Sequence, residues 1–158
     1  MTRDIIMPPG CVCQPADSAR LCAVVASGVA VTVFDRRLAL GGMGHYARPY
    51  RKGDLSTALY ACPAIVSLVG MLQDAGSMVE DLDACLYGGA VNTHASGYVE
   101  GFSEDNVRVG LEVLQKLSVR VQSLDVGGAY GRKIVFHTGT GEAVVAKVEK
   151  LRSTDWYV

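Results

Sequence analysis

His45 is the side chain in this sequence that is best placed to act as a general base. It comes directly after a predicted strand and is preceded by Gly41, Gly42 and Gly44. Glycines beside a histidine leave room for a substrate to approach the ring, and an unperturbed imidazole titrates near neutral pH. The same pattern fits a structural or an exposed histidine, so the residue types alone leave both interpretations open.

Nucleophiles that could work with this base are found elsewhere in the chain. Cys22 precedes the pair Ser27-Gly28, and its thiol would lie near His45 if the two predicted strands are neighbours. A thiol needs a nearby base or positive charge to become a thiolate. Ser27 is a further possible nucleophile, although no Gly-x-Ser-x-Gly turn surrounds it. Cys62 falls at the start of a predicted helix, where the dipole favours a thiolate, but packing is its expected role.

The remaining chemical motifs favour ordinary structural roles. Cys11 and Cys13 lie on one side of a predicted strand with no Cys/His pair at zinc-like spacing, so buried thiols are expected in place of a metal site. Gly139–Glu142 resembles a phosphate loop but lacks the lysine–hydroxyl pair and a following helix, so it predicts a hairpin turn. His94 in a loop and His137 at a strand end are interpreted as ordinary residues. No cofactor is expected.

Hydrophobic periodicity predicts two helices, Pro63–Ala75 and Glu104–Lys116, with Ser103 expected to cap the second. The apolar stretch Leu21–Phe34 is broken at Ser27-Gly28, which predicts two strands or one bent strand. This balance of elements favours an α+β fold, a mostly antiparallel sheet assembly with helices packed on it. The other predicted strands are Cys11–Gln14, Leu38–Met43, Val79–Tyr87, Val119–Asp125, Lys133–His137 and Ala143–Val148.

Length and composition are those of one ordinary globular domain. The chain has 158 residues, of which 49% are hydrophobic and 20% charged, so it can bury a core without disulfides or metals. We expect residues 1–158 to form a single domain. Residues 1–10 are expected to be a loose N-terminal arm, and residues 149–158 a C-terminal tail.

Charge and hydropathy argue against several classes of protein. The net charge is −1, and the densest cationic cluster is Arg48, Arg51 and Lys52 in a polar loop over Arg48–Thr57, so no nucleic-acid partner is expected. No apolar run approaches the roughly 20 residues that span a bilayer, and the N-terminus lacks the apolar core of a secretory signal. A cytoplasmic location without membrane insertion is therefore expected. The five cysteines, an odd number, predict free thiols.

Several motifs, taken together and in order, resemble the chemoreceptor glutamine deamidase (CheD) family. Ala26–Asp35 is similar to that family's Gly-Ser-Cys-Val-Ala-Val strand, which ends in Asp. Gly41–His45 is similar to its Gly-Gly-Met-x-His motif, and Leu86–Ala90 to its Phe-Gly-Gly-Ala motif. The closing pattern of the family is matched by Asp125–Gly128, Gly131-Arg132 and Thr140-Gly141.

The resemblance implies an α/β sandwich that hydrolyses side-chain amides of glutamines on bacterial chemoreceptors, giving glutamate and ammonia. The family uses a cysteine, a histidine and a threonine, and it binds CheC, a phosphatase of the chemotaxis response regulator. The histidine falls on His45, the nucleophilic cysteine on Gly28 and the threonine on Cys22. The family's Ile-Gly-x-Arg-Asn motif retains only its last residue, Asn106.

These matches and mismatches lead to two hypotheses. The first is a CheD-like protein whose activity is impaired at Gly28 and which binds receptor helices or a CheC-like partner, because hydrolysis by this route needs a nucleophile. The alternative is an active deamidase in which Cys22 works with His45. Ser27, Gly41 and Gly42 are the expected substrate-binding residues in either case. A Gly28 that belongs to an unusual paralogue of an active enzyme stays open as well.

Overall fold

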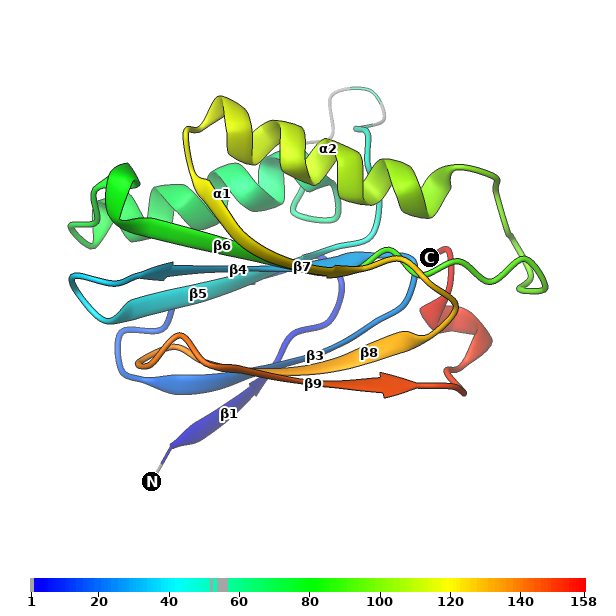
Figure 1. The fold of residues 1–158 in the computed structure, drawn as a ribbon, viewed down its shortest axis with the longest axis horizontal. Coiled ribbons are helices and arrows are strands. Elements are labelled where there is room, and N and C mark those ends of the chain that lie inside the picture. The colour runs from blue at the N-terminus through cyan, green and yellow to red at the C-terminus, as the bar shows by residue number, and fades with distance from the viewer. Residues whose placement is uncertain (1, 52, 54–56) are drawn as a thin grey trace.

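The computed structural model of the chain describes residues 2–51, 53 and 57–158 and has three stacked layers (Figure 1). Two helices cover one face of a five-stranded sheet, and a four-stranded sheet packs against the other face. This mostly antiparallel sandwich confirms the predicted α+β class. The elements are β1 (Arg3–Ile6), β2 (Cys11–Cys13), β3 (Ala19–Val25), β4 (Val29–Asp35), β5 (Leu40–Tyr46), α1 (Ala61–Asp74), the 3-10 turn η1 (Val79–Asp81), β6 (Leu82–Gly88), α2 (Phe102–Lys116), β7 (Arg120–Val126), β8 (Gly131–His137), β9 (Ala143–Val148) and the 3-10 turn η2 (Ser153–Asp155).

The five-stranded sheet has the order β2-β5-β4-β6-β7 and forms the middle layer. Its central strand β4 pairs antiparallel with β5 and β6, while β6 and β7 run parallel on either side of the α2 crossover. Both faces of β4 are covered, which explains why its sequence is mostly apolar and does not alternate between apolar and polar residues.

The helices bury the predicted apolar stripes against this sheet. On α1 the stripe includes Ile65, Leu68 and Leu72, all fully buried, and burying each such side chain contributes about 1.5–3 kcal/mol. The helix begins at Ala61, two residues before the predicted start, which brings Cys62 into its first turn.

The four-stranded sheet has the order β1-β3-β8-β9 and forms the third layer. Its inner face and the lower face of the five-stranded sheet enclose a second core between the two sheets. The fully or nearly buried members of this core are Met7, Leu21, Ala23, Val25, Ala30, Met43, Tyr87, Ile134 and Phe136.

The expected loose arm over residues 1–10 is wrong. Arg3–Ile6 forms β1, which pairs parallel with β3 along the edge of the four-stranded sheet. Met7 is buried at 2% exposure, and its backbone N–H donates to the Cys22 carbonyl at 2.8 Å. The arm is ordered because its backbone hydrogen bonds extend an existing sheet edge, a partnership that local composition does not reveal.

Two element boundaries differ from prediction in ways that matter for the site. The turn after β4 continues through Ala39, because the Asp35 carboxylate accepts hydrogen bonds from the backbone N–H groups of Arg37 and Leu38. The next strand, β5, therefore runs from Leu40 to Tyr46, and His45 lies inside it and not after its end.

Ser103 does not cap α2, because the helix begins at Phe102, two residues before the predicted start, with Gly101 as its N-cap. The Ser103 hydroxyl instead donates to the Ala90 carbonyl at 2.7 Å. The predicted strand Val79–Tyr87 opens as the 3-10 turn η1 before β6. The predicted polar loop Arg48–Thr57 includes residues 52 and 54–56, which lie outside the described residues.

No helix in the described part of the chain is long and apolar enough to cross a membrane.

Candidate functional site

The predicted break at Ser27-Gly28 is the point where the chain passes from one sheet to the other. It separates β3, in the four-stranded sheet, from β4, in the five-stranded sheet. The crossing is held by residues at the end of β6: Gly89 N–H donates to the Gly28 carbonyl at 2.9 Å, and Ala90 N–H donates to the Ala26 carbonyl at 2.8 Å. The Gly-Gly-Ala motif therefore acts as a backbone clamp on the crossing.

Gly88 explains why this clamp needs glycine. Its φ of +125° is one that residues with side chains rarely adopt, and a Cβ there would collide with the Gly28 carbonyl. The backbone at Gly88, at the end of β6, is thus in close contact with the backbone at Gly28, in the break after β3.

Asn106, from α2, lies beside the site, although the sequence indicated it only as the retained last residue of the Ile-Gly-x-Arg-Asn motif. It is fully buried, and its Nδ2 donates to the Ser27 carbonyl at 2.8 Å and to the Ala47 carbonyl at 3.1 Å. Its own backbone carbonyl accepts from the Tyr46 hydroxyl at 2.6 Å. One amide thereby joins the helix, the sheet crossing and the end of β5. Its spacing of three residues from Val109 and seven from Val113, on the buried side of the helix, was the signal available for finding it.

His45 points into the layer between the two sheets and is 3% exposed. Its Nδ1 lies 2.8 Å from the Met7 carbonyl oxygen. A carbonyl can only accept, so Nδ1 carries the proton and Nε2 holds the free lone pair. Burial lowers the pKa of His45, opposed in part by the Met7 hydrogen bond. A neutral imidazole with an unprotonated Nε2 is the form that a general base requires.

A cavity of about 230 Å³ brings the predicted residues Ser27, Gly28 and His45 together. One side is formed by these residues and their neighbours on β3 and β5. The other side is formed by residues from the predicted tail, which folds back over the crossing. The cavity is lined by Pro9, Val24, Ala26, Ser27, Gly28, His45, Ala47, Arg152, Thr154, Asp155 and Val158.

The backbone closes tightly around Gly28. A Cβ on this residue would lie 2.7 Å from the Tyr46 carbonyl oxygen and 3.3 Å from the Ala47 Cα. Both neighbours are backbone atoms that are held in place by β5 and by Asn106, so neither can rotate away. The position therefore offers neither a side chain nor the room for one in this arrangement.

Cys22 does not line the cavity that contains His45. On β3, Leu21 and Ala23 are buried between the sheets, so strand alternation directs Cys22 to the outer face of the four-stranded sheet. Its Sγ lies 4.0 Å from the Arg20 carbonyl. Burial, together with the nearby Asp4 carboxylate, raises the pKa of the Cys22 thiol, which is opposite to the shift that activates a nucleophile.

Ser27 and the two predicted substrate-binding glycines have structural partners. The Ser27 hydroxyl oxygen accepts from the Tyr157 N–H at 2.8 Å, and the residue is 2% exposed. A Cβ on Gly41 would meet Phe136 and the Thr138 carbonyl at 3.0 Å, and one on Gly42 would lie 2.7 Å from Leu68 Cδ1. Neither glycine lines the cavity. They allow the other sheet and α1 to pack closely on β5.

Arg132 is a further residue whose role only the structure shows. It lies on β8 at 3% exposure and pairs with Asp125 at 3.1 Å. Its guanidinium also donates to the Gly127 carbonyl at 2.9 Å and to the Gly88 carbonyl at 3.4 Å. The motifs Asp125–Gly128 and Gly131-Arg132 therefore tie the two sheets together beside the clamp.

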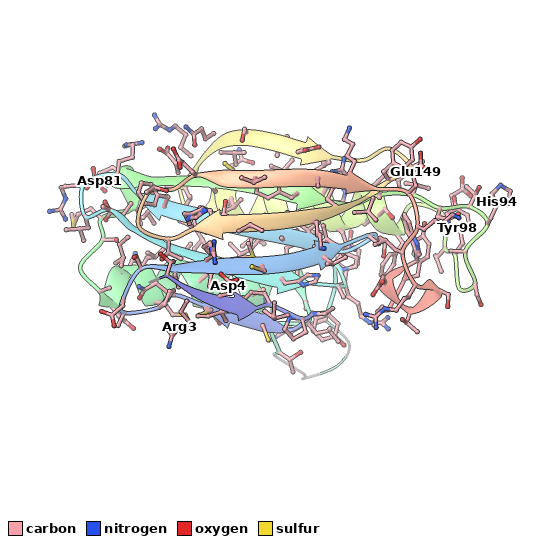
Figure 2. All side chains as sticks on the ribbon, turned by 90° about the horizontal axis from the view of Figure 1, so that it is seen from below. Arg3, Asp4, Asp81, His94, Tyr98 and Glu149 are labelled. Carbon is pink, nitrogen blue, oxygen red and sulfur yellow. The ribbon has the colours of Figure 1, made fainter. Side chains whose placement is uncertain are left out.

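The other chemical candidates lie apart from this cavity. Cys62 is exposed, Cys11 and Cys13 are half-buried free thiols, and burial raises the pKa of Cys13. Among the described residues, no group of three His, Cys, Asp or Glu side chains could hold a metal ion. Figure 2 shows His94 on a loop that projects beyond the ends of the sheets. His137 ends β8, and the hairpin predicted over residues 138–141 joins it to β9.

A larger cavity, of about 490 Å³, lies between α2 and the loop after β7. It is lined by side chains such as Val107, Leu111 and Val126 and includes none of the predicted catalytic residues. The candidate site is the smaller cavity, because that cavity is where the histidine, the sheet crossing and the clamp meet.

Comparison with known proteins identifies a family to which this chain is similar. Residues 47–147 match the family model of CheD, described as CheD chemotactic sensory transduction. A relative from Trichlorobacter lovleyi, "Probable chemoreceptor glutamine deamidase CheD", is 30% identical over 92% of this chain and 91% of its own length. One from Anaeromyxobacter dehalogenans, "Probable chemoreceptor glutamine deamidase CheD 1", is 30% identical over 91% of this chain and 84% of its own length. One from Vibrio cholerae is 30% identical over 89% of this chain and 64% of its own length.

Proposed function

The chain belongs to the CheD family, and on that premise we propose that it is a binding regulator on a deamidase scaffold with impaired catalysis. It would recognise the cytoplasmic helices of a chemoreceptor, or a CheC-like phosphatase, in the cytoplasm. The observation that carries the proposal is that a residue without a side chain, Gly28, lines the same cavity as His45. The Nε2 atom of His45 is free to accept a proton.

Loss of activity follows from what deamidation requires. Hydrolysis of a glutamine amide by the family's route forms an acyl-enzyme on a nucleophilic side chain, and Gly28 has none. A Cβ on Gly28 would lie 2.7 Å from the Tyr46 carbonyl oxygen, so this arrangement leaves no space for a side chain there. Removing the nucleophile from a coupled catalytic set costs on the order of a million-fold in rate.

Retention of binding follows from the intact framework. None of the contacts that hold the site involves a side chain at position 28. They are the backbone hydrogen bonds of Gly89 and Ala90, the side-chain amide of Asn106 and the His45–Met7 hydrogen bond. They hold the cavity and its surrounding surface in one geometry. A receptor segment that docks there would be recognised by shape and backbone contacts, which need no thiol.

The alternative, an active deamidase that pairs Cys22 with His45, has less support. Cys22 is outside the cavity, on the opposite face of its sheet from the layer that contains His45. The pKa of its thiol is raised and not lowered. A nucleophile displaced from its attack position also loses most of the benefit of orientation.

Incubation of the protein with the cytoplasmic fragment of a chemoreceptor tests the catalytic part. Ammonia release and the mass change from glutamine to glutamate would be followed for the wild type, His45→Ala and Cys22→Ser. We expect no turnover above the protein-free rate in any of the three. Turnover by the wild type that Cys22→Ser abolishes would establish the alternative instead.

Fluorescence anisotropy with a labelled receptor fragment tests the binding part. Val24 lines the cavity and is 40% exposed, whereas Val144 is 63% exposed on β9 at the far edge of the same sheet. We expect Val24→Glu to weaken binding about tenfold or more, which corresponds to about 1.4 kcal/mol, and Val144→Glu to leave it unchanged. Equal weakening by both variants, or no measurable binding by the wild type, would refute this docking site.

A further inference from the structure

The segment 151–158 folds back over the candidate site and supplies one of its walls. Arg152, Thr154, Asp155 and Val158 line the cavity together with Ser27, Gly28 and His45. None of the β-ladders includes this segment, which follows β9 and contains only the 3-10 turn η2. It is therefore attached by side-chain contacts and isolated hydrogen bonds, which are easier to break than a sheet.

The attachment is concentrated at two aromatic residues. Trp156 is 5% exposed and packs on Ala26 and Ala90, the two residues joined by the clamp. Tyr157 N–H donates to the Ser27 hydroxyl oxygen at 2.8 Å, and the Tyr157 hydroxyl accepts from Asn92 N–H at 2.9 Å. The segment thus binds the sheet crossing directly, at the residue next to Gly28.

The loop after β6 and the first residue of α2 complete the contacts of the segment. The Tyr157 ring meets the rings of Tyr98 and Phe102 edge-on, with centroids 5.6 and 5.8 Å apart, a favourable aromatic geometry. Figure 2 shows Tyr98 on this loop, close to the C-terminal segment drawn in red. Neither the loop nor the segment belongs to a sheet, so both can move without disrupting a strand.

The backbone of the segment is strained where it is anchored. Tyr157 has a φ of +50°, a left-handed conformation that costs a residue with a side chain of this size. Such a conformation persists only while the surrounding contacts hold it. Loss of the Ser27 or Asn92 contact therefore favours release, because release also relieves the strain.

We propose that residues 151–158 are a displaceable lid on the CheD-like site, closed by Trp156 and Tyr157. Opening exposes His45 and the surface around Ser27, and a chemoreceptor helix that docks there competes with the lid. The closing contacts stand on the structure alone. The identity of the competitor rests on the proposed function.

Opening can be measured without any partner. Trp156 is the only tryptophan in the chain, so its emission maximum and its quenching by acrylamide report the lid directly. We expect Tyr157→Ala to shift the emission to longer wavelength and increase quenching. The matched substitution Tyr130→Ala, at a residue 45% exposed on the loop before β8, should change neither.

Access to His45 gives a second readout with internal controls. Diethyl pyrocarbonate modifies neutral imidazoles, and the chain has three histidines, at positions 45, 94 and 137. If the closed form holds about 90% or more of the wild type, opening the lid should raise the rate at His45 about tenfold or more. The rates at His94 and His137 should not change.

A milder substitution at Tyr157 distinguishes opening of the lid from misfolding of the protein. Tyr157→Phe keeps the ring but removes the acceptor for Asn92 N–H, so its effect on Trp156 and His45 should be intermediate while circular dichroism stays that of the wild type. Unchanged Trp156 emission and unchanged His45 modification in both Tyr157 variants would overturn the lid.

Binding of the receptor fragment separates this proposal from the previous one. We expect Tyr157→Ala to bind the fragment about tenfold more tightly than the wild type. The variant is already open, so none of the binding free energy is used to displace the lid. If Tyr157→Ala opens the lid but neither this variant nor the wild type binds the fragment, the lid is supported and the proposed docking function is refuted. Binding of equal strength in both would overturn the competition between lid and partner.

Discussion

The Asn106 side chain donates to the Ser27 carbonyl at 2.8 Å, across 79 residues of sequence. Through its second bond, to Ala47, it also reaches the residue that follows Tyr46, whose carbonyl approaches Gly28. A helix on one side of the five-stranded sheet thereby sets the position of the sheet crossing and of the backbone that crowds Gly28. The geometry of the candidate site depends on this one buried amide.

Replacement of Asn106 by leucine should destabilise the fold. The change removes the donor but keeps a similar volume, which leaves the Ser27 and Ala47 carbonyls buried without a partner. Each unsatisfied group costs about 1–3 kcal/mol, so the free energy of unfolding in urea should fall by at least that amount. Gln115→Leu, at an exposed position of the same helix, should change it by less than about 0.5 kcal/mol. Equal losses in the two variants would contradict the role given to Asn106.

Gly28→Cys should not restore a working nucleophile. The new Cβ would lie 2.7 Å from the Tyr46 carbonyl oxygen, and overpacking of this kind costs about 1–3 kcal/mol. We expect a lower melting temperature and no release of ammonia from a receptor fragment. Gly70→Ala is the matched control, because nothing lies within 4 Å of its Cβ position on α1, and it should stabilise the helix by up to about 1 kcal/mol. A Gly28→Cys protein of wild-type stability that deamidates the fragment would show that the backbone at Tyr46 can move to accommodate the new side chain.

The lowered pKa of His45 predicts how stability depends on pH. Below the ordinary histidine value of 6.5, the unfolded chain takes up a proton that the buried ring resists. The unfolded state then binds more protons, so the free energy of unfolding falls as the pH drops below 6.5. It levels off once the folded ring is protonated, and each unit of lowering is worth about 1.4 kcal/mol. Above 6.5 both states are neutral at this residue and it contributes no slope.

Urea denaturation at a series of pH values measures this dependence. His45→Asn can still donate to the Met7 carbonyl but does not titrate, so its stability should lose the part of the slope that His45 causes. His94→Asn, on the exposed loop, should retain the wild-type slope. A slope that survives in His45→Asn would assign the pH dependence to other groups.

Much of the fold could be predicted because its signals are local. The apolar stripe of α1, the break at Ser27-Gly28 and the hairpin before β9 all depend on neighbours along the chain, where periodicity and turn chemistry act. The ordered motifs also indicated the CheD family, which the comparisons establish. The errors occurred where a distant partner overrides local preference: β1 is ordered by the edge of β3, and Ser103 bonds to Ala90 and does not cap its helix.

The candidate site shows the same division. Residue types indicated His45 as a candidate base, and the family resemblance aligned Gly28 with the expected nucleophile position and Cys22 with the expected threonine position. Whether those side chains meet was decided by how the two sheets pack, which brings Ser27, Gly28 and His45 to one cavity and leaves Cys22 outside its lining. The lid was hidden for the same reason, because Tyr157 and Ser27 are 130 residues apart. A hydrogen bond over that distance exists only once the sheets have packed, and no local pattern encodes it.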